Sequence, residues 1–214
     1  GLPGETLSVP VRFENIGNYD DQINLSGEGI LQAVSGDPSS PWTIEGANSS
    51  ILDVGENNTL LLNISIPEDA WNGSIMTIDW TILAGEIQTL EGPSHRIEVG
   101  HAPSWSIVAT GIDLDISPEG EIIELSIVQD GNLPAEPYAN TFVKGVLGWN
   151  VSVLEMPGIL SPGESGLMRL NITPPETTIA GAAVELNIIL RNADGSGTST
   201  TTLPIRVDAV HDHL

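Results

Sequence analysis

Seven asparagines stand in the pattern Asn-x-Ser/Thr, the acceptor sequence for N-linked glycans. They are Asn24, Asn48, Asn57, Asn63, Asn72, Asn150 and Asn171. A bulky glycan requires an exposed asparagine, so the pattern predicts glycosylation on the surface of a secreted chain. Exposed strands and turns also favour Asn, Ser and Thr, which leaves unmodified sites as the alternative.

Clustered carboxylates suggest a second kind of chemistry, the binding of a hard cation such as calcium. Asp113 and Asp115 are two residues apart, which places both carboxylates on the same side of a strand, and Glu119 follows them. These three residues form the predicted calcium site. The sequence lacks the D-x-D-x-D-G loop, so solvated acidic side chains without an ion are the alternative. No other cofactor is expected.

The residue types needed for catalysis are missing or wrongly spaced. The chain has no cysteine, which excludes disulfides, thiolate zinc sites and cysteine nucleophiles. Gly163-Glu-Ser-Gly lacks the G-x-S-x-G spacing of a nucleophile elbow. No carboxylate stands isolated in an apolar stretch that would raise its pKa for acid catalysis. We therefore expect no catalytic residues and no enzyme activity.

The charge balance excludes two classes of partner. The chain has 29 acidic and 6 basic residues, a formal net charge of −23, and Lys144 is its only lysine. Nucleic acids and anionic membrane surfaces are bound through Lys and Arg, so neither is an expected partner. No apolar stretch approaches the roughly 20 residues of a membrane helix. The chain begins at Gly1 without a leader, which is typical of a mature or excised fragment.

The two halves of the chain repeat one another. Residues 51–73 and 159–181 match at a constant offset of 108, with 10 of 23 positions identical. Trp42 matches Trp149 one residue out of step, and residues 5–18 resemble residues 121–132. The repeat predicts two modules, residues 1–100 and 101–214, joined by a short, semi-rigid junction.

Each module alternates apolar and polar residues with the period of a half-buried strand. No helical period is sustained, and the turn residues recur at intervals typical of a β-sandwich. Pro10 and Pro204 fall on outward positions and favour edge strands. The predicted fold is all-β: two tandem immunoglobulin-like antiparallel β-sandwiches of about seven strands each. The predicted inward residues are Leu62, Ile64, Ile78, Trp80, Leu170, Ile172, Leu186 and Ile188.

Five tryptophans offer the alternative of a sugar-stacking platform. Trp80 aligns with Ile188 on an inward position, and Trp42 recurs as Trp149, as a core tryptophan would. Only Trp71, in a loop, is expected to be exposed.

At these positions the sequence resembles a known family. Pro3-Gly4-Glu5 opens a strand, a tryptophan strand and a Gly-Glu turn follow, and a Pro…Gly loop comes next. This order is similar to that of the tandem Ig-like modules of archaeal and bacterial surface proteins, of the CARDB type and the NPCBM-associated alpha-galactosidase type. The resemblance implies a spacer, adhesion or accessory module.

The expected function is therefore a structural or interaction segment of an exported cell-surface protein from an archaeon or bacterium of saline habitat. Its partners would be a protein or glycan at the cell surface, or other copies of itself. Two alternatives stay open: a subunit of an extracellular filament or surface layer assembled through edge strands, and an accessory module of a secreted hydrolase.

Overall fold

The computed structural model describes residues 1–34, 41–46, 49–84, 88–91, 94–108 and 114–208. These residues form strands and turns, and none of them belongs to a helix that could cross a membrane. The chain divides into two compact units, Gly1–His101 and Ala102–Leu214. Each unit is a pair of β-sheets around its own apolar core, so the predicted all-β, Ig-like sandwich fold is confirmed.

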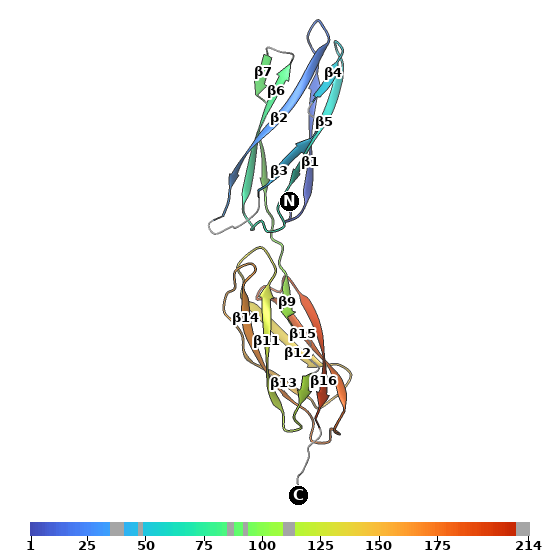
Figure 1. The fold of residues 1–214 in the computed structure, drawn as a ribbon, viewed down its shortest axis with the longest axis vertical. Coiled ribbons are helices and arrows are strands. Elements are labelled where there is room, and N and C mark those ends of the chain that lie inside the picture. The colour runs from blue at the N-terminus through green and yellow to red at the C-terminus, as the bar shows by residue number, and fades with distance from the viewer. Residues whose placement is uncertain (35–40, 47–48, 85–87, 92–93, 109–113, 209–214) are drawn as a thin grey trace. The chain divides into compact units, whose positions relative to one another are not determined.

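The first unit contains eight strands in its described residues (Figure 1). They are β1 (Thr6–Glu14), β2 (Asp21–Gln32), β3 (Thr43–Gly46), β4 (Ser49–Leu52), β5 (Asn57–Ser65), β6 (Ile75–Ala84), β7 (Gln88–Glu91) and β8 (His95–Glu98). One sheet has the order β1-β5-β3, and the other has the order β4-β2-β6-β7, with β8 also paired to β6.

The second unit is a related pair of sheets, of four strands each, formed by strands β9 to β16 (Figure 1). They are β9 (Trp105–Val108), β10 (Leu114–Ile116), β11 (Glu121–Gln129), β12 (Pro137–Val143), β13 (Asn150–Glu155), β14 (Ser165–Thr173), β15 (Ala183–Asn192) and β16 (Ser199–Val207). The sheet orders are β13-β14-β11-β9 and β10-β16-β15-β12.

The strand ladders establish which strands of the two units are equivalent. Ser8 pairs with Asn63, and Ile122 pairs with Asn171, so β1 corresponds to β11 and β5 to β14. Leu7 pairs with Ile64, and Glu121 pairs with the equivalent residue Ile172. Leu7, and not Glu5, is therefore equivalent to Glu121. The sequence match at the start of this strand was therefore wrong by two residues, because the turns before the two strands differ in length.

Two details of the sheets differ from the prediction. The β10–β16 ladder is parallel, whereas we expected antiparallel pairing throughout. Pro10 lies on the edge strand β1 as predicted, but Pro204 lies on β16, which has a neighbour on each side. The β10 ladder on β16 begins at Ile205, one residue past the proline, so Pro204 lies outside the part of β16 that pairs with β10.

Both units close the same turn with the same hydrogen bonds. The Asp53 N–H donates to the Glu56 carboxylate (2.9 Å), and the Glu56 N–H donates to the Asp53 carbonyl (3.0 Å). Ser161 and Glu164 make the same two bonds, each of 2.9 Å. The glycine before each glutamate has a φ of +81° or +78°, which only glycine adopts without steric cost. This turn fixes the entry into β5 and β14.

A buried amide side chain holds the loop that faces this turn. Asn15 Nδ2 donates to the carbonyls of Tyr19 and Leu52, each at 3.0 Å. In the second unit Gln129 Nε2 donates to the carbonyl of Leu133 at 2.8 Å. In both units the side-chain oxygen accepts from the N–H two residues later, at 2.9 and 2.6 Å. The longer side chain of Gln129 thus holds the equivalent loop in the second unit.

The eight predicted inward residues are all confirmed as core residues, with at most 3% of each exposed. They lie on β5 and β6 of the first unit and on the equivalent β14 and β15 of the second. The strand phase inferred from alternation is therefore right on both pairs of strands.

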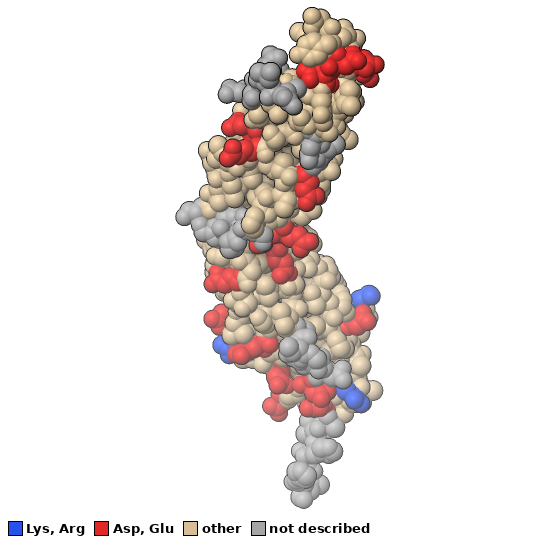
Figure 2. Space-filling model, turned by 45° about the horizontal axis from the view of Figure 1, so that its top comes forward, with Lys and Arg blue, Asp and Glu red and all other residues tan. Residues whose placement is uncertain are grey.

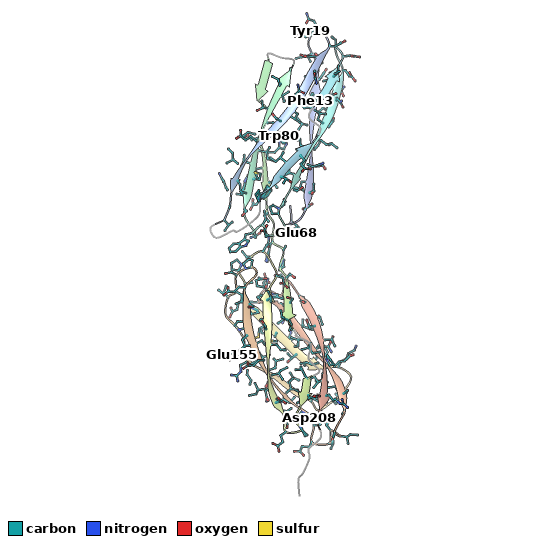
Figure 3. All side chains as sticks on the ribbon, viewed as in Figure 1. Phe13, Tyr19, Glu68, Trp80, Glu155 and Asp208 are labelled. Carbon is teal, nitrogen blue, oxygen red and sulfur yellow. The ribbon has the colours of Figure 1, made fainter. Side chains whose placement is uncertain are left out.

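At one cross-strand pair, the two units fill the same part of the core with different side chains. Gly27 pairs with Trp80 in the first unit, and Thr141 pairs with Ile188 at the equivalent place in the second. A Cβ on Gly27 would lie 2.6 Å from a ring atom of Trp80, which lies between the sheets of its unit (Figure 3). The indole also donates to His95 Nδ1. The large residue in one unit is therefore matched by a glycine across the ladder.

We expect Leu62→Ala to lower the free energy of unfolding of the first unit by roughly 2–5 kcal/mol, because it empties a core site. Leu61, its neighbour on the strand, is 51% exposed against 3% for Leu62. Leu61→Ala should therefore cost less than about 0.5 kcal/mol. Urea denaturation of both variants measures the difference, and equal losses would contradict the strand phase.

Gly27→Thr should destabilise the first unit by about 1–3 kcal/mol, because the new side chain enters the space of the Trp80 ring. The double variant Gly27→Thr/Trp80→Ile has the same Thr/Ile pair as the second unit. The double variant should lose at least about 1 kcal/mol less than the sum of the two single variants. Chemical denaturation of the four proteins of this cycle provides the measurement. Strictly additive losses would show that the two side chains do not compete for space.

Candidate functional site

The predicted glycan acceptors are spread over both units. Asn57, Asn63 and Asn150 are exposed, whereas Asn24, Asn72 and Asn171 are half-buried. Asn48 lies outside the described residues. None of the six described acceptors is buried, so each retains an accessible side to which a glycan could be attached.

Asn63 and Asn171 occupy equivalent outward positions on the central strands β5 and β14. Asn63 Oδ1 accepts a hydrogen bond from the Ser8 hydroxyl at 2.7 Å, which leaves its Nδ2, the atom that carries a glycan, unused in that bond. Asn171 lies between Ile122 and Ser152 of the neighbouring strands. The predicted orientation is confirmed, with Asn171 less accessible because of its neighbours.

The predicted calcium site is described only in part. Asp113 lies outside the described residues, and Asp115 and Glu119 are both exposed. In the described part of the chain, no three His, Asp or Glu side chains cluster closely enough to hold a metal ion. Calcium binding by Asp113, Asp115 and Glu119 stays a prediction.

The tryptophans do not form a sugar-stacking platform. Trp42, Trp80 and Trp105 are buried, with 8%, 2% and 2% exposed. Trp149 packs against the core of its unit, and Trp71, which we expected to be exposed, is half-buried. Burial explains their recurrence in the repeat.

The surface is strongly acidic. On the face drawn in Figure 2, Asp and Glu side chains occur on both units, and the visible Lys and Arg side chains lie on the second unit. Three of the cations are already neutralised: Arg96 by Glu98, Lys144 by Glu185, and Arg169 by two glutamates. These pairs are solvent-exposed and contribute little to stability.

A groove of about 660 Å³ lies in the first unit beside β2, where β4 no longer pairs with it. It is lined by Asn24, Leu25, Ser26, Gly27, Ile44, Glu45, Leu62 and Leu83. Among the described residues that line the groove, Glu45 is the one titratable side chain.

One surface of the second unit was missed by the sequence analysis. We name it the β12–β16 face: the outer side of the sheet formed by β12, β15 and β16. Its outward residues are Tyr138, Asn140, Phe142, Glu185, Asn187, Ile189, Arg191, Thr200, Thr202, Pro204 and Arg206. The sequence contains a signal for this surface, because Tyr138, Asn140 and Phe142 alternate with inward residues along β12.

Two aromatic side chains and a cation are the distinctive members of this face. Tyr138 and Phe142 on the edge strand β12 are 50% and 48% exposed. The Arg191 guanidinium lies over the Tyr138 ring, with its carbon 5.0 Å from the ring centroid. An arginine stacked on an exposed aromatic ring on an edge strand is the feature that makes this face a candidate binding surface.

No protein-family model matches the chain, and no curated protein is significantly similar to it. The resemblance to the CARDB and NPCBM-associated types is therefore not supported by a family match.

Several solved structures are distantly similar. Domains 4 and 5 of the S-layer protein SbsC share 13% identity, with a TM-score of 0.36, over 83% of this chain and 74% of that chain. The sialic acid binding region of a Streptococcus sanguinis SK1 adhesin shares 10% identity, with a TM-score of 0.36, over 97% and 75%. A Porphyromonas gingivalis W83 protein of unknown function shares 14%, with a TM-score of 0.33, over 96% and 93%. Such weak likeness says nothing of what this chain binds.

Proposed function

We propose that this chain is a structural and adhesive segment of an extracellular surface protein. The observation that carries the proposal is the repetition of one hydrogen-bonded frame in both units. The Asp53–Glu56 and Ser161–Glu164 turns make the same bonds, and each unit has its own core. A chain built by repeating a stable frame, with no catalytic cluster in its described residues, suits a spacing or presenting role.

The surface properties support an extracellular setting. A net charge of −23 keeps separate copies soluble, and salt screens the repulsion within each copy. The acceptor asparagines of the described residues all lie at or near the surface. We therefore propose that the chain is exposed outside the cell and carries N-linked glycans at several of these sites.

Assembly into a filament or surface layer is the second candidate. It is favoured by the edge strand β12, which has a free side and no proline after its first residue. Such an edge can pair with a strand of another chain. The edge strand β1 is less suited, because Pro10 lacks the N–H that a ladder needs. Electron microscopy of the purified chain would show filaments or lattices only under this second candidate.

The role of accessory module is a third candidate, from the class of binding proteins. It is favoured by the groove beside β2 and by the exposed aromatic residues of the β12–β16 face. A catalytic domain in the adjoining sequence of the parent protein would favour this candidate over a spacer.

Extracellular exposure can be tested at Lys144, the only lysine, whose side chain is 69% exposed. A membrane-impermeant, amine-reactive biotin reagent applied to intact cells of the native source should label Lys144 as fully as it does after lysis. Peptides from a glutamate-specific protease, read by mass spectrometry, provide the measurement. Labelling that appears only after lysis would contradict the extracellular location.

Glycan occupancy should follow exposure. In protein from the native source, we expect glycans on Asn57, Asn63 and Asn150 more often than on Asn72 and Asn171, because an exposed amide is easier to reach. Glycopeptide mass spectrometry measures the occupancy of each site.

A matched control leaves the asparagine in place. Ser65→Ala destroys the acceptor pattern of Asn63 without changing Asn63, and it should abolish any glycan there. A chain without sugar at all six described acceptors would contradict the glycosylation proposal and leave the fold unaffected.

A further inference from the structure

We propose that the β12–β16 face of the second unit binds an oligosaccharide that carries carboxylate groups. The site does not depend on whether the chain serves as a spacer, a filament subunit or an accessory module. It rests on an unpaired cation, two exposed aromatic rings, an unsatisfied amide and the loss of all of these in the first unit.

The cation is Arg191. Among the described residues, no carboxylate lies within ion-pair distance of its guanidinium, although the chain has 29 acidic residues. The stacking on Tyr138 uses the face of the guanidinium and leaves its N–H groups at the rim free. A planar guanidinium with free donors matches the two oxygens of a carboxylate. A carboxylate of the ligand would form the ion pair that Arg191 lacks among the described residues.

The aromatic rings set the size of the ligand. Tyr138 and Phe142 are four residues apart on β12, on the same side, which separates them by about 13 Å along the strand. Sugar rings present flat arrays of C–H groups that pack on such side chains. Two rings at this spacing suit a chain of about three linked sugars.

Asn187, on β15 beside Phe142, has a further unpaired donor. It is 7% exposed and pairs directly with Phe142 across the ladder. Its Oδ1 accepts from the Thr202 hydroxyl at 3.0 Å, but its Nδ2 has no partner among the described residues. An unpaired buried donor costs about 1–3 kcal/mol. A rotamer change of Phe142 that keeps its ring packed against the sugar would let a ligand oxygen satisfy this amide.

The first unit carries none of these features at the equivalent positions. Asn24 takes the place of Tyr138, and Leu83 that of Arg191. Glu28 and Asp79 pair directly across the ladder where the second unit has Phe142 and Asn187. Two carboxylates at this point would repel an acidic ligand. The inward residues stay apolar in both units, so the two copies differ in what the outer face can bind.

The local charge favours a small acidic ligand. Lys144, Arg191 and Arg206, half of the basic residues of the chain, lie on or beside this face. The acids on or beside this face are Asp115, Glu136, Glu185, Asp194 and Asp208, so the face holds half of the basic residues of the chain but only five of its 29 acidic residues. A second copy of the chain would bring the same large negative charge and be repelled. A short oligosaccharide brings only a few charges.

The test is an NMR titration of the full, ¹⁵N-labelled chain with trigalacturonate at low ionic strength. Saturable shifts should be confined to β12, β15 and β16. Arg191→Gln should weaken binding at least about tenfold, and Tyr138→Ala or Phe142→Ala severalfold. The fully methyl-esterified trisaccharide, which has no charge, should bind at least about tenfold more weakly than the acid.

Arg12→Gln is the matched control, because it removes the same charge from the first unit, and it should change the dissociation constant by less than about twofold. Dispersed spectra establish that each variant is folded. The proposal is overturned if trigalacturonate up to about 10 mM causes no saturable shifts, or if they map to another surface. It is also overturned if Arg12→Gln matches Arg191→Gln. Shifts on this face that depend on protein concentration alone, and vanish in Arg191→Gln, would assign it to a second copy instead.

Discussion

The structure depends on one constraint: each sheet must turn one side of every strand toward a shared apolar core. Because side chains alternate along a strand, satisfying the core at Leu62 and Ile64 places Asn63 between them on the outside. The same constraint acts on β14 in the second unit. The positions of the glycan acceptors on these strands therefore follow from the packing of the core.

The same constraint explains where the two units are free to differ. In the core, a change of side-chain volume on one strand must be matched on the strand paired with it. The pair Gly27–Trp80 of the first unit is replaced in this way by Thr141–Ile188 in the second. Outside, no such match is required, and the two copies diverge in charge and aromatic content. The turns change least, since the hydrogen bonds of Glu56 and its equivalent fix the start of a central strand. A duplicated frame thus leaves one outer face available for a new role.

The acidic surface and the β12–β16 face have different physical effects. Acidic side chains occur on both units (Figure 2), and their charge opposes the approach of polyanions. The β12–β16 face, with half of the basic residues of the chain and with Arg191 held over Tyr138, is a local exception on that surface. The two properties are compatible, because charge repulsion acts over the whole surface whereas the proposed site is confined to one face.

The all-β fold, the repeat and the strand phase could be read from the sequence alone, because alternation and turn glycines are local signals. It also placed Asn63 outside and Trp80 inside. Tertiary structure decided which strands are neighbours, and so which outward residues form one surface. The meeting of Tyr138 with Arg191 depends on the pairing of β12 with β15, two strands separated by 39 residues (144–182) in the chain. Pairing between distant strands is fixed by packing of the whole sandwich, and no local pattern records it.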